Sequence, residues 1–203
     1  MATGRFKKLE GHSDDKGNVC YQLHFTDSRI DLNDRLGQII SIEFTGEIHC
    51  VACQRKIKKP FNGYCYPCFR GLPQADMCMV KPETCHFHLG TCRDREWGTA
   101  HCFINHTVYL ANSSGIKVGI TRQEPIKRWM DQGASQGLAA WQVKSRLETG
   151  LVEMALKSHI SDKTNWRKML KGQPSSVDLL GIRENLMSQL PKDLDIELGA
   201  PEV

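Results

Sequence analysis

Alternating apolar and polar positions near the start of the chain predict β-strands. The stretches NVCYQLHF (residues 18–25) and GQIISIEFTGEIH (37–49) place Val, Ile, Leu, Tyr and Phe at every second position. This is the period of a strand that buries one face. Because a polar, turn-like segment separates the two stretches, we expect a small antiparallel sheet over residues 1–48.

A different order of elements follows residue 105. HTVYLAN (106–112) and GIKVGIT (115–121) predict two short strands joined by turn-forming residues. Pro125 suits the first turn of a helix that ends at Gly133. Later segments predict a strand and two helices, around residues 138–145, 149–160 and 165–170.

The last part of the chain predicts one more helix and a loose end. Val177, Leu180, Met187 and Leu190 lie near helical spacing and favour a helix that docks on the preceding domain. The acidic stretch PKDLDIELGAPEV beyond it is expected to be mobile. The fold class is therefore α+β, and four units are expected, at residues 1–48, 49–105, 106–171 and 172–203.

Cysteine content changes the picture in the second unit. Eight of the nine cysteines lie between Cys50 and Cys102, and only Cys20 lies outside. The N-terminus has no apolar signal region, so we expect a cytoplasmic protein in which cysteines bind metal instead of forming disulfides. Cys50-x2-Cys53 and Cys65-x2-Cys68 predict two knuckles around one tetrahedral Zn²⁺.

A second zinc site is expected from the other four cysteines, Cys78, Cys85, Cys92 and Cys102. His86, His88 and His101 are alternative ligands, and a set of reduced core cysteines is the alternative to a metal site. The stretch has few Ile, Leu and Val residues, and a segment with little apolar area to bury usually needs a metal to fold. Both zinc sites would be closed and structural.

The charge of the chain is +4, and it is unevenly distributed. Residues 183–203 hold five acids and two bases, so residues 1–182 carry 25 bases against 18 acids. No apolar run approaches the roughly 20 residues of a membrane span. Two clusters of bases suit a nucleic acid partner, although a solvated charged surface is the alternative; they are Arg55, Lys56, Lys58, Lys59 and Arg122, Lys127, Arg128.

Residues 106–171 resemble the GIY-YIG nuclease superfamily. The resemblance is carried by five positions in the family's order, Tyr109, Gly119, Arg128, Glu153 and Asn165. Lys117 occupies the place of the second motif's tyrosine, as in the branch of the superfamily with a Lys-Ile/Val-Gly-x-Thr motif, and no histidine follows Arg128 at the common spacing. The whole chain also resembles an uncharacterised bacterial family that joins zinc-binding cysteines to this domain.

The resemblance implies a short mixed sheet flanked by helices and Mg²⁺-dependent cleavage of DNA or RNA. In these terms Tyr109 orients or activates water, Arg128 clamps phosphoryl oxygens, and Glu153 is the single carboxylate that holds Mg²⁺. Lys117, Gly119 and Asn165 complete the expected catalytic set.

A non-catalytic role can also explain these residues. Tyr109 can pack at a strand end, and Glu153 can pair with Lys157 on a helix surface. Asn165 can cap a helix. Trp129 can stack on a base of single-stranded nucleic acid or pack in the core. A non-catalytic nucleic-acid-binding protein and a zinc-stabilised protein-interaction scaffold therefore stand beside the nuclease as alternatives.

Overall fold

The N-terminal part of the chain forms a separate antiparallel sheet. The computed structural model describes residues 4–122, 124–172 and 174–199. Strands β1 (Phe6–Ser13), β2 (Val19–Phe25) and β3 (Arg29–Asp31) pair in that order, and η1 (Asn33–Arg35) follows. The predicted N-terminal sheet and the α+β class are both confirmed.

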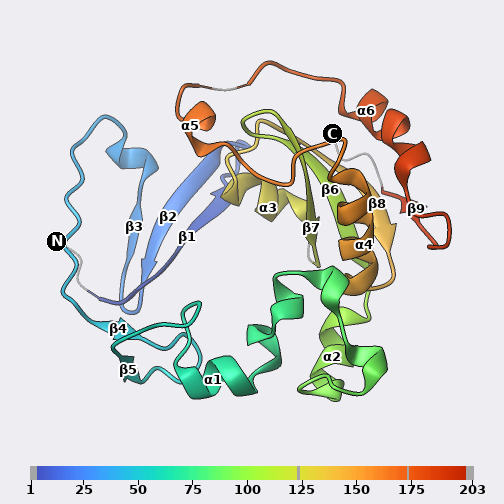
Figure 1. Cartoon of the computed structure of the whole chain (residues 1–203). Helices are drawn as coiled ribbons and strands as arrows, with labels where there is room; N and C mark the ends of the chain where they lie inside the picture. Colours follow the sequence, from blue (N-terminus) through green and yellow to red (C-terminus); the bar gives the residue numbers. More distant parts are fainter. Residues whose placement is uncertain (1–3, 123, 173, 200–203) are drawn as a thin grey trace.

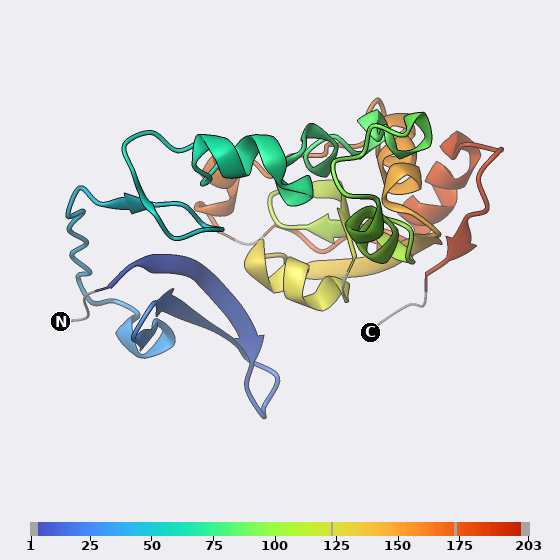
Figure 2. The ribbon, with the colours of Figure 1, turned by 90° about the horizontal axis from the view of Figure 1, so that it is seen from below.

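This sheet lies against helix α3 (Pro125–Asp131), which contacts β1 at the end of the sheet nearest the rest of the chain in Figures 1 and 2. Tyr21 donates a hydrogen bond of 2.7 Å to the carbonyl oxygen of Met130. Lys127 Nζ lies 2.6 Å from Glu10 Oε1. Hydrogen bonds from Lys127 and Lys8 lower the pKa of Glu10 to about 2. Polar contacts therefore tie the sheet to the rest of the chain.

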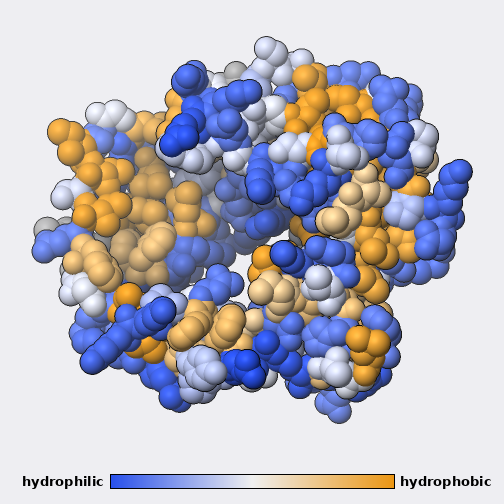
Figure 3. Space-filling model, viewed as in Figure 1, coloured by the Kyte–Doolittle hydropathy of each residue, from blue (hydrophilic) through white to orange (hydrophobic). Residues whose placement is uncertain are grey.

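The strand predicted over residues 37–49 is wrong for most of its length. Only Ile48–His49 (β4) pairs, with Lys56–Ile57 (β5). Ile39 is fully exposed, and Phe44 is 71% exposed. Figure 3 shows apolar side chains gathered along the left edge, over the segment that links β3 to β4. The alternating pattern is present, but no neighbouring strand of the described chain pairs with this segment.

The cysteine-rich region consists of short helical turns along the lower edge of Figure 1. Within residues 49–105, the buried apolar positions of the core are Cys50, Cys65 and Ala75. The region therefore lacks the aliphatic core that would hold its turns together, as its composition predicts. Its elements are α1 (Tyr66–Gly71), η2 (Pro73–Ala75), η3 (Met77–Met79), η4 (Pro82–Thr84), η5 (Phe87–Leu89) and α2 (Arg95–Cys102).

The main sheet has the strand order β7-β6-β8-β9, and all its ladders are antiparallel. Lys117 forms one additional parallel bridge with Ser161. Strands β6 (His106–Asn112) and β7 (Ile116–Thr121) confirm the predicted pair, and β8 (Gln136–Val143) is the predicted third strand. Val108, Leu110 and Val118 are buried on one face. Because strand side chains alternate, Tyr109 and Gly119 belong to the opposite face.

Helices α4 (Arg146–Leu156) and α6 (Leu179–Leu186) contribute to the core under this sheet, which includes Trp141, Val152 and Leu179. Helix α4 starts three residues earlier than predicted, because Ser145 and Glu148 form a capping box. Helix α5 (Trp166–Met169) begins after its N-cap Asn165. None of the described helices has the length and apolar content needed to cross a membrane.

Residues 187–199 adopt defined structure where a mobile end is expected, and residues 200–203 of that predicted end lie outside the described residues. After α6 and η6 (Met187–Gln189), strand β9 (Glu197–Leu198) pairs with β8, and Leu198 lies opposite Trp141. Leu194 and Ile196 pack against the core. The acidic side chains of this segment are exposed, and the apolar side chains between them pack at the edge of the sheet. The prediction of a mobile end was wrong because it considered only the acidic composition.

Gly137 is expected to be essential for packing α3 on the sheet. A Cβ atom at this position would lie 2.2 Å from the indole ring of Trp129. Gly137→Ala should therefore lower the free energy of unfolding by about 1–3 kcal/mol, measured by denaturant unfolding. Gly71→Ala is the control, because a Cβ there meets nothing within 4 Å. Equal stability of the two variants would contradict this account of the packing.

Candidate functional site

Four cysteines form a compact cluster between two turns. The sulfur atoms of Cys50, Cys53, Cys65 and Cys68 all lie within 4.8 Å of one another. The backbone turns that gather them need positive φ angles, 62° at Gln54 and 86° at Gly63. Gly63 provides this conformation without strain. The first four predicted metal ligands are therefore brought close enough together to hold one metal ion.

The surroundings of Cys50 and Cys53 favour thiolates, whereas the hydrogen bond with Cys65 and burial raise the pKa of Cys68 to about 12. Burial raises the pKa of Cys50, but backbone N–H groups of Cys53, Cys65 and Ala52 outweigh it and lower the pKa to about 6. The N–H of Arg55 lowers the pKa of Cys53, and the Arg55 guanidinium donates to Cys53 Sγ at 3.1 Å. Because the thiolate is the form that binds metal, these donors fit a metal-binding role.

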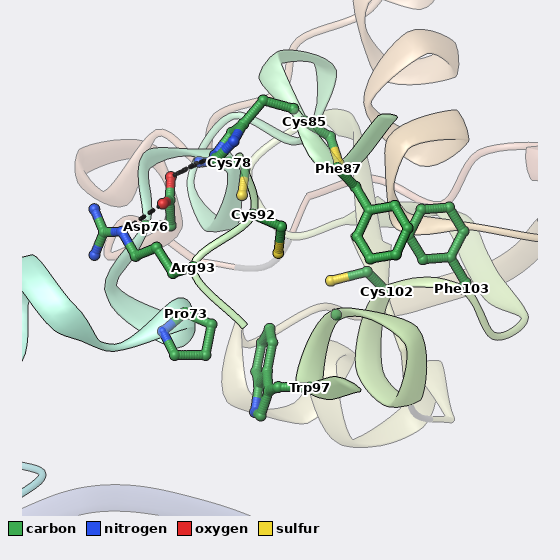
Figure 4. A pocket seen from close by; sticks show the side chains of 12 residues that line it. Pro73, Asp76, Cys78, Cys85, Phe87, Cys92, Arg93, Trp97, Cys102 and Phe103 are labelled. Carbon is green, nitrogen blue, oxygen red and sulfur yellow. Dashed lines mark hydrogen bonds and ion pairs between the residues drawn. The ribbon is translucent and has the colours of Figure 1, made fainter. Parts of the chain in front are cut away.

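A second group of cysteines surrounds a small cavity of about 20 Å³, shown in Figure 4. This volume is about that of one water molecule, and therefore suits a single ion. Burial, then the charge of Asp76, raises the pKa of Cys78 to about 12. The cavity is lined by all four remaining predicted ligands, Cys78, Cys85, Cys92 and Cys102, but Cys85, Cys92 and Cys102 belong to no group of described ligand atoms that lie within 4.8 Å of one another.

An alternative ligand set lies at one side of this cavity. Ligand atoms of Asp76, Cys78 and His86 lie within 4.8 Å of one another. Asp76 is also held by Arg93, whose Nε lies 2.6 Å from a carboxylate oxygen. His101 instead stacks on Trp97, with ring centres 4.3 Å apart. Of the histidines considered as ligands, His86 is the one that lines the cavity.

A larger cleft of about 600 Å³ lies between the main sheet and the cysteine-rich region. Figure 3 shows that this face of the molecule is hollowed near its centre and that hydrophilic residues gather there. Asn165 does not line the cleft, since its side chain caps α5 by accepting from Lys168 N at 3.1 Å. Five of the six predicted catalytic residues line it, namely Tyr109, Lys117, Gly119, Arg128 and Glu153.

The position of Tyr109 depends on two neighbours. Tyr109 lies opposite Gly119 in the strand pair, and a Cβ on Gly119 would come within 2.5 Å of the tyrosine oxygen. Gln132 Nε2 donates to that oxygen at 2.8 Å. The ring is 1% exposed, so Tyr109 is packed and oriented at the same time.

Lys117 and Glu153 are both partly withdrawn from water. Burial lowers the pKa of Lys117, and the charge of Arg128 acts in the same direction. Lys117 Nζ donates to Thr164 Oγ1 at 2.7 Å. Burial raises the pKa of Glu153, and the charges of Asp162 and Glu83 raise it further.

The alternative of a surface ion pair at Glu153 does not describe this site. Lys157 lies 3.8 Å from Asp162, and no ion pair joins it to Glu153 among the described residues. The charges of Lys157 and Arg146 act in the opposite direction and lower the pKa of Glu153, so both carboxylates and cations influence this side chain.

Most of the basic residues predicted to bind nucleic acid lie outside the cleft. Arg55 contacts Cys53, Lys56 pairs with Glu47, Lys59 lies over the ring of Phe61, and Lys58 is exposed. Lys127 pairs with Glu10. Trp129 packs on Gly137, with its indole nitrogen buried. Arg122 and Arg128 are the members of the two clusters that line the cleft.

Sequence reasoning missed the opposite wall of the cleft. Trp97 and His101 of α2 and Arg146 of α4 line it. No local sequence pattern predicts that α2 lines the same cleft as residues of the main sheet. The sequence pattern Ser145-x-x-Glu148 is typical of a capping box and could have predicted that α4 begins at Arg146.

Comparison with known proteins assigns the chain to a family whose activity is unknown. No curated protein and no solved structure matches the chain significantly. One family model matches residues 37–201, which are most of the chain and include both cysteine groups and the cleft. The N-terminal sheet lies outside the match. The chain therefore belongs to the family DUF2797, described as a protein of unknown function.

Proposed function

We propose that this protein is a zinc-containing, Mg²⁺-dependent nuclease that cleaves phosphodiester bonds of nucleic acid in the cleft. One observation carries the proposal, which is that Tyr109, Lys117, Arg128 and Glu153 line the same cleft although they come from different elements. The order of these residues in the chain is that of the GIY-YIG family, so sequence order and spatial arrangement support the same chemistry.

The side chains of the cleft match the needs of phosphodiester hydrolysis. Such a reaction needs an oriented water, positive charge at the phosphoryl oxygens, and help for the leaving oxygen. Tyr109 offers an oxygen held by Gln132 and is therefore suited to orient the attacking water. Arg128 offers a planar fork of donors for two phosphoryl oxygens. Lys117 adds a second positive charge from the neighbouring strand.

Glu153 would hold Mg²⁺ in this proposal. When bound, the ion supplies positive charge that stabilises the transition state at phosphorus and at the leaving oxygen. The polar neighbours of Glu153 include Asp162, which lines the same cleft.

The cysteine groups are proposed to hold structural Zn²⁺, one ion in each. Four thiolates in a closed set are typical of structural zinc and leave no open position for catalysis. Support comes from the N–H donors around Cys50 and from the cavity of single-ion size beside Cys78. Because η3 and α2, which border the second group, also line the cleft, zinc would hold one wall of the proposed active site.

Metal analysis of cysteine variants tests the structural role. We expect two zinc ions per chain in the purified protein. Cys65→Ser should lose one equivalent, because Cys65 is a buried member of the first group. Cys20→Ser is the control and should keep both ions, since Cys20 lies on β2, away from both groups. Unchanged zinc in Cys65→Ser would contradict the assignment.

Glu153→Gln tests the metal-dependent step. The amide keeps the shape but loses the charge that would hold Mg²⁺, so cleavage of DNA or RNA should fall at least about 100-fold while the zinc content stays constant. Glu184→Gln, on the exposed side of α6, should cleave like the wild type. If the wild type binds nucleic acid but cuts neither DNA nor RNA with Mg²⁺ or Mn²⁺, the non-catalytic alternative replaces the nuclease.

Tyr109→Phe removes the hydroxyl and keeps the ring that packs over Gly119. We expect kcat to fall roughly 100-fold with little change in KM, because the lost oxygen acts on water and not on substrate binding. The loss of the hydrogen bond from Gln132 should lower the free energy of unfolding by about 1–3 kcal/mol. Tyr66→Phe is the matched control on an exposed tyrosine. A Tyr109→Phe variant with the wild-type kcat would exclude a catalytic role for the hydroxyl.

A further inference from the structure

Two arginines in the cleft lie outside the expected catalytic set. Arg122 follows β7, and Arg146 is the first residue of α4. Both line the cleft. Arg146 donates through one terminal nitrogen to the carbonyl oxygen of Met79 at 2.6 Å, and its Nε is buried without a hydrogen-bond partner. Throughout the described ranges, neither arginine forms an ion pair with a carboxylate.

The position of Arg146 is unfavourable for a cation. It stands at a helix N-terminus, where the helix dipole disfavours positive charge. Burial lowers its pKa, and the charge of Arg122 acts in the same direction, while the thiols of Cys102 and Cys78 and the carboxylate of Glu153 raise it. A partly buried cation with an unpaired donor and a like charge nearby is costly unless an anion joins it. A phosphate bound beside Arg146 would accept a hydrogen bond from its free Nε–H and would offset the charge of Arg122.

We propose that Arg146 and Arg122 form a second phosphate subsite in the cleft, in addition to the site at Arg128 and Lys117. The proposal rests on the proposed function, because it assumes that the cleft receives a nucleic acid backbone. The charge of Arg128 acts on Lys117 and the charge of Arg122 acts on Arg146, while the carboxylate of Glu153 acts on both Lys117 and Arg146. The preferred substrate is then an oligonucleotide with at least two phosphates in the cleft, and a mononucleotide diester fills one site only.

Arg146 also has a purely structural reading. Its hydrogen bond to Met79 joins α4 to η3, so its loss would loosen the cysteine-rich wall. Arg122 is exposed and has no such role. A test that compares both arginines therefore separates phosphate binding from packing.

The salt dependence of binding provides that test. Binding of a fluorescent single-stranded octanucleotide is measured by anisotropy without added Mg²⁺, over a series of salt concentrations. Arg146→Gln and Arg122→Gln should each bind about tenfold more weakly at low salt. Each should also show a slope of log affinity against log salt that is shallower by about 0.7, the value for one phosphate contact with a single strand. Arg146→Lys should keep the wild-type slope, because it keeps the charge.

Lys192→Gln is the matched control, since it removes one exposed charge outside the cleft and should leave the slope unchanged. If the wild type binds and both Arg→Gln variants keep its slope, the second subsite is overturned while the proposed function stands. If the wild type itself binds no oligonucleotide, both proposals are overturned. If Arg146→Gln fails to fold, Arg122→Gln decides the question alone.

Discussion

The phenol ring of Tyr109 lies across the neighbouring strand at the one position where that strand has no side chain. A single carbon on Gly119 would meet the ring at 2.5 Å. Because the ring is sealed in by this contact and by the edge of Trp129, its hydroxyl has a fixed place beside Gln132. Lys117, on the same strand as Gly119, and Arg128, on α3, line the same cleft as this tyrosine. The close approach of the two strands thus fixes the place of Tyr109 in the cleft.

The other wall of the cleft is built in a different way. Its residues come from short turns that bury little aliphatic surface. Two groups of cysteines lie among these turns in place of an aliphatic core. A sheet domain can hold a tyrosine to within fractions of an ångström by packing. A segment without a core needs cross-links, and thiolate–metal bonds are short and directional enough to provide them. The two regions meet where Arg146 reaches from α4 to the carbonyl of Met79.

The sequence predicts the parts of this molecule whose signals are local. Strands β6 and β7 and helix α3 follow from alternation, Pro125 and Gly133, and the cysteine knuckles follow from their spacing. The strand predicted at 37–49 failed because alternation shows that one face is apolar and cannot show whether a partner strand exists. The C-terminal strand was missed because Leu198 finds its partner in Trp141, more than fifty positions away. Arg146 was missed as a cleft residue because it is brought there by the packing of α4 on the cysteine-rich turns.

The central claim is that the cleft binds a phosphodiester and a divalent cation at the same place. A crystal structure of the protein with Mn²⁺ and a short phosphorothioate oligonucleotide tests it most directly, since the anomalous signal of manganese locates the ion. We predict a manganese ion at the carboxylate of Glu153, with a backbone phosphate between it and Arg128. Manganese bound elsewhere, or an oligonucleotide that lies outside the cleft, would contradict this account.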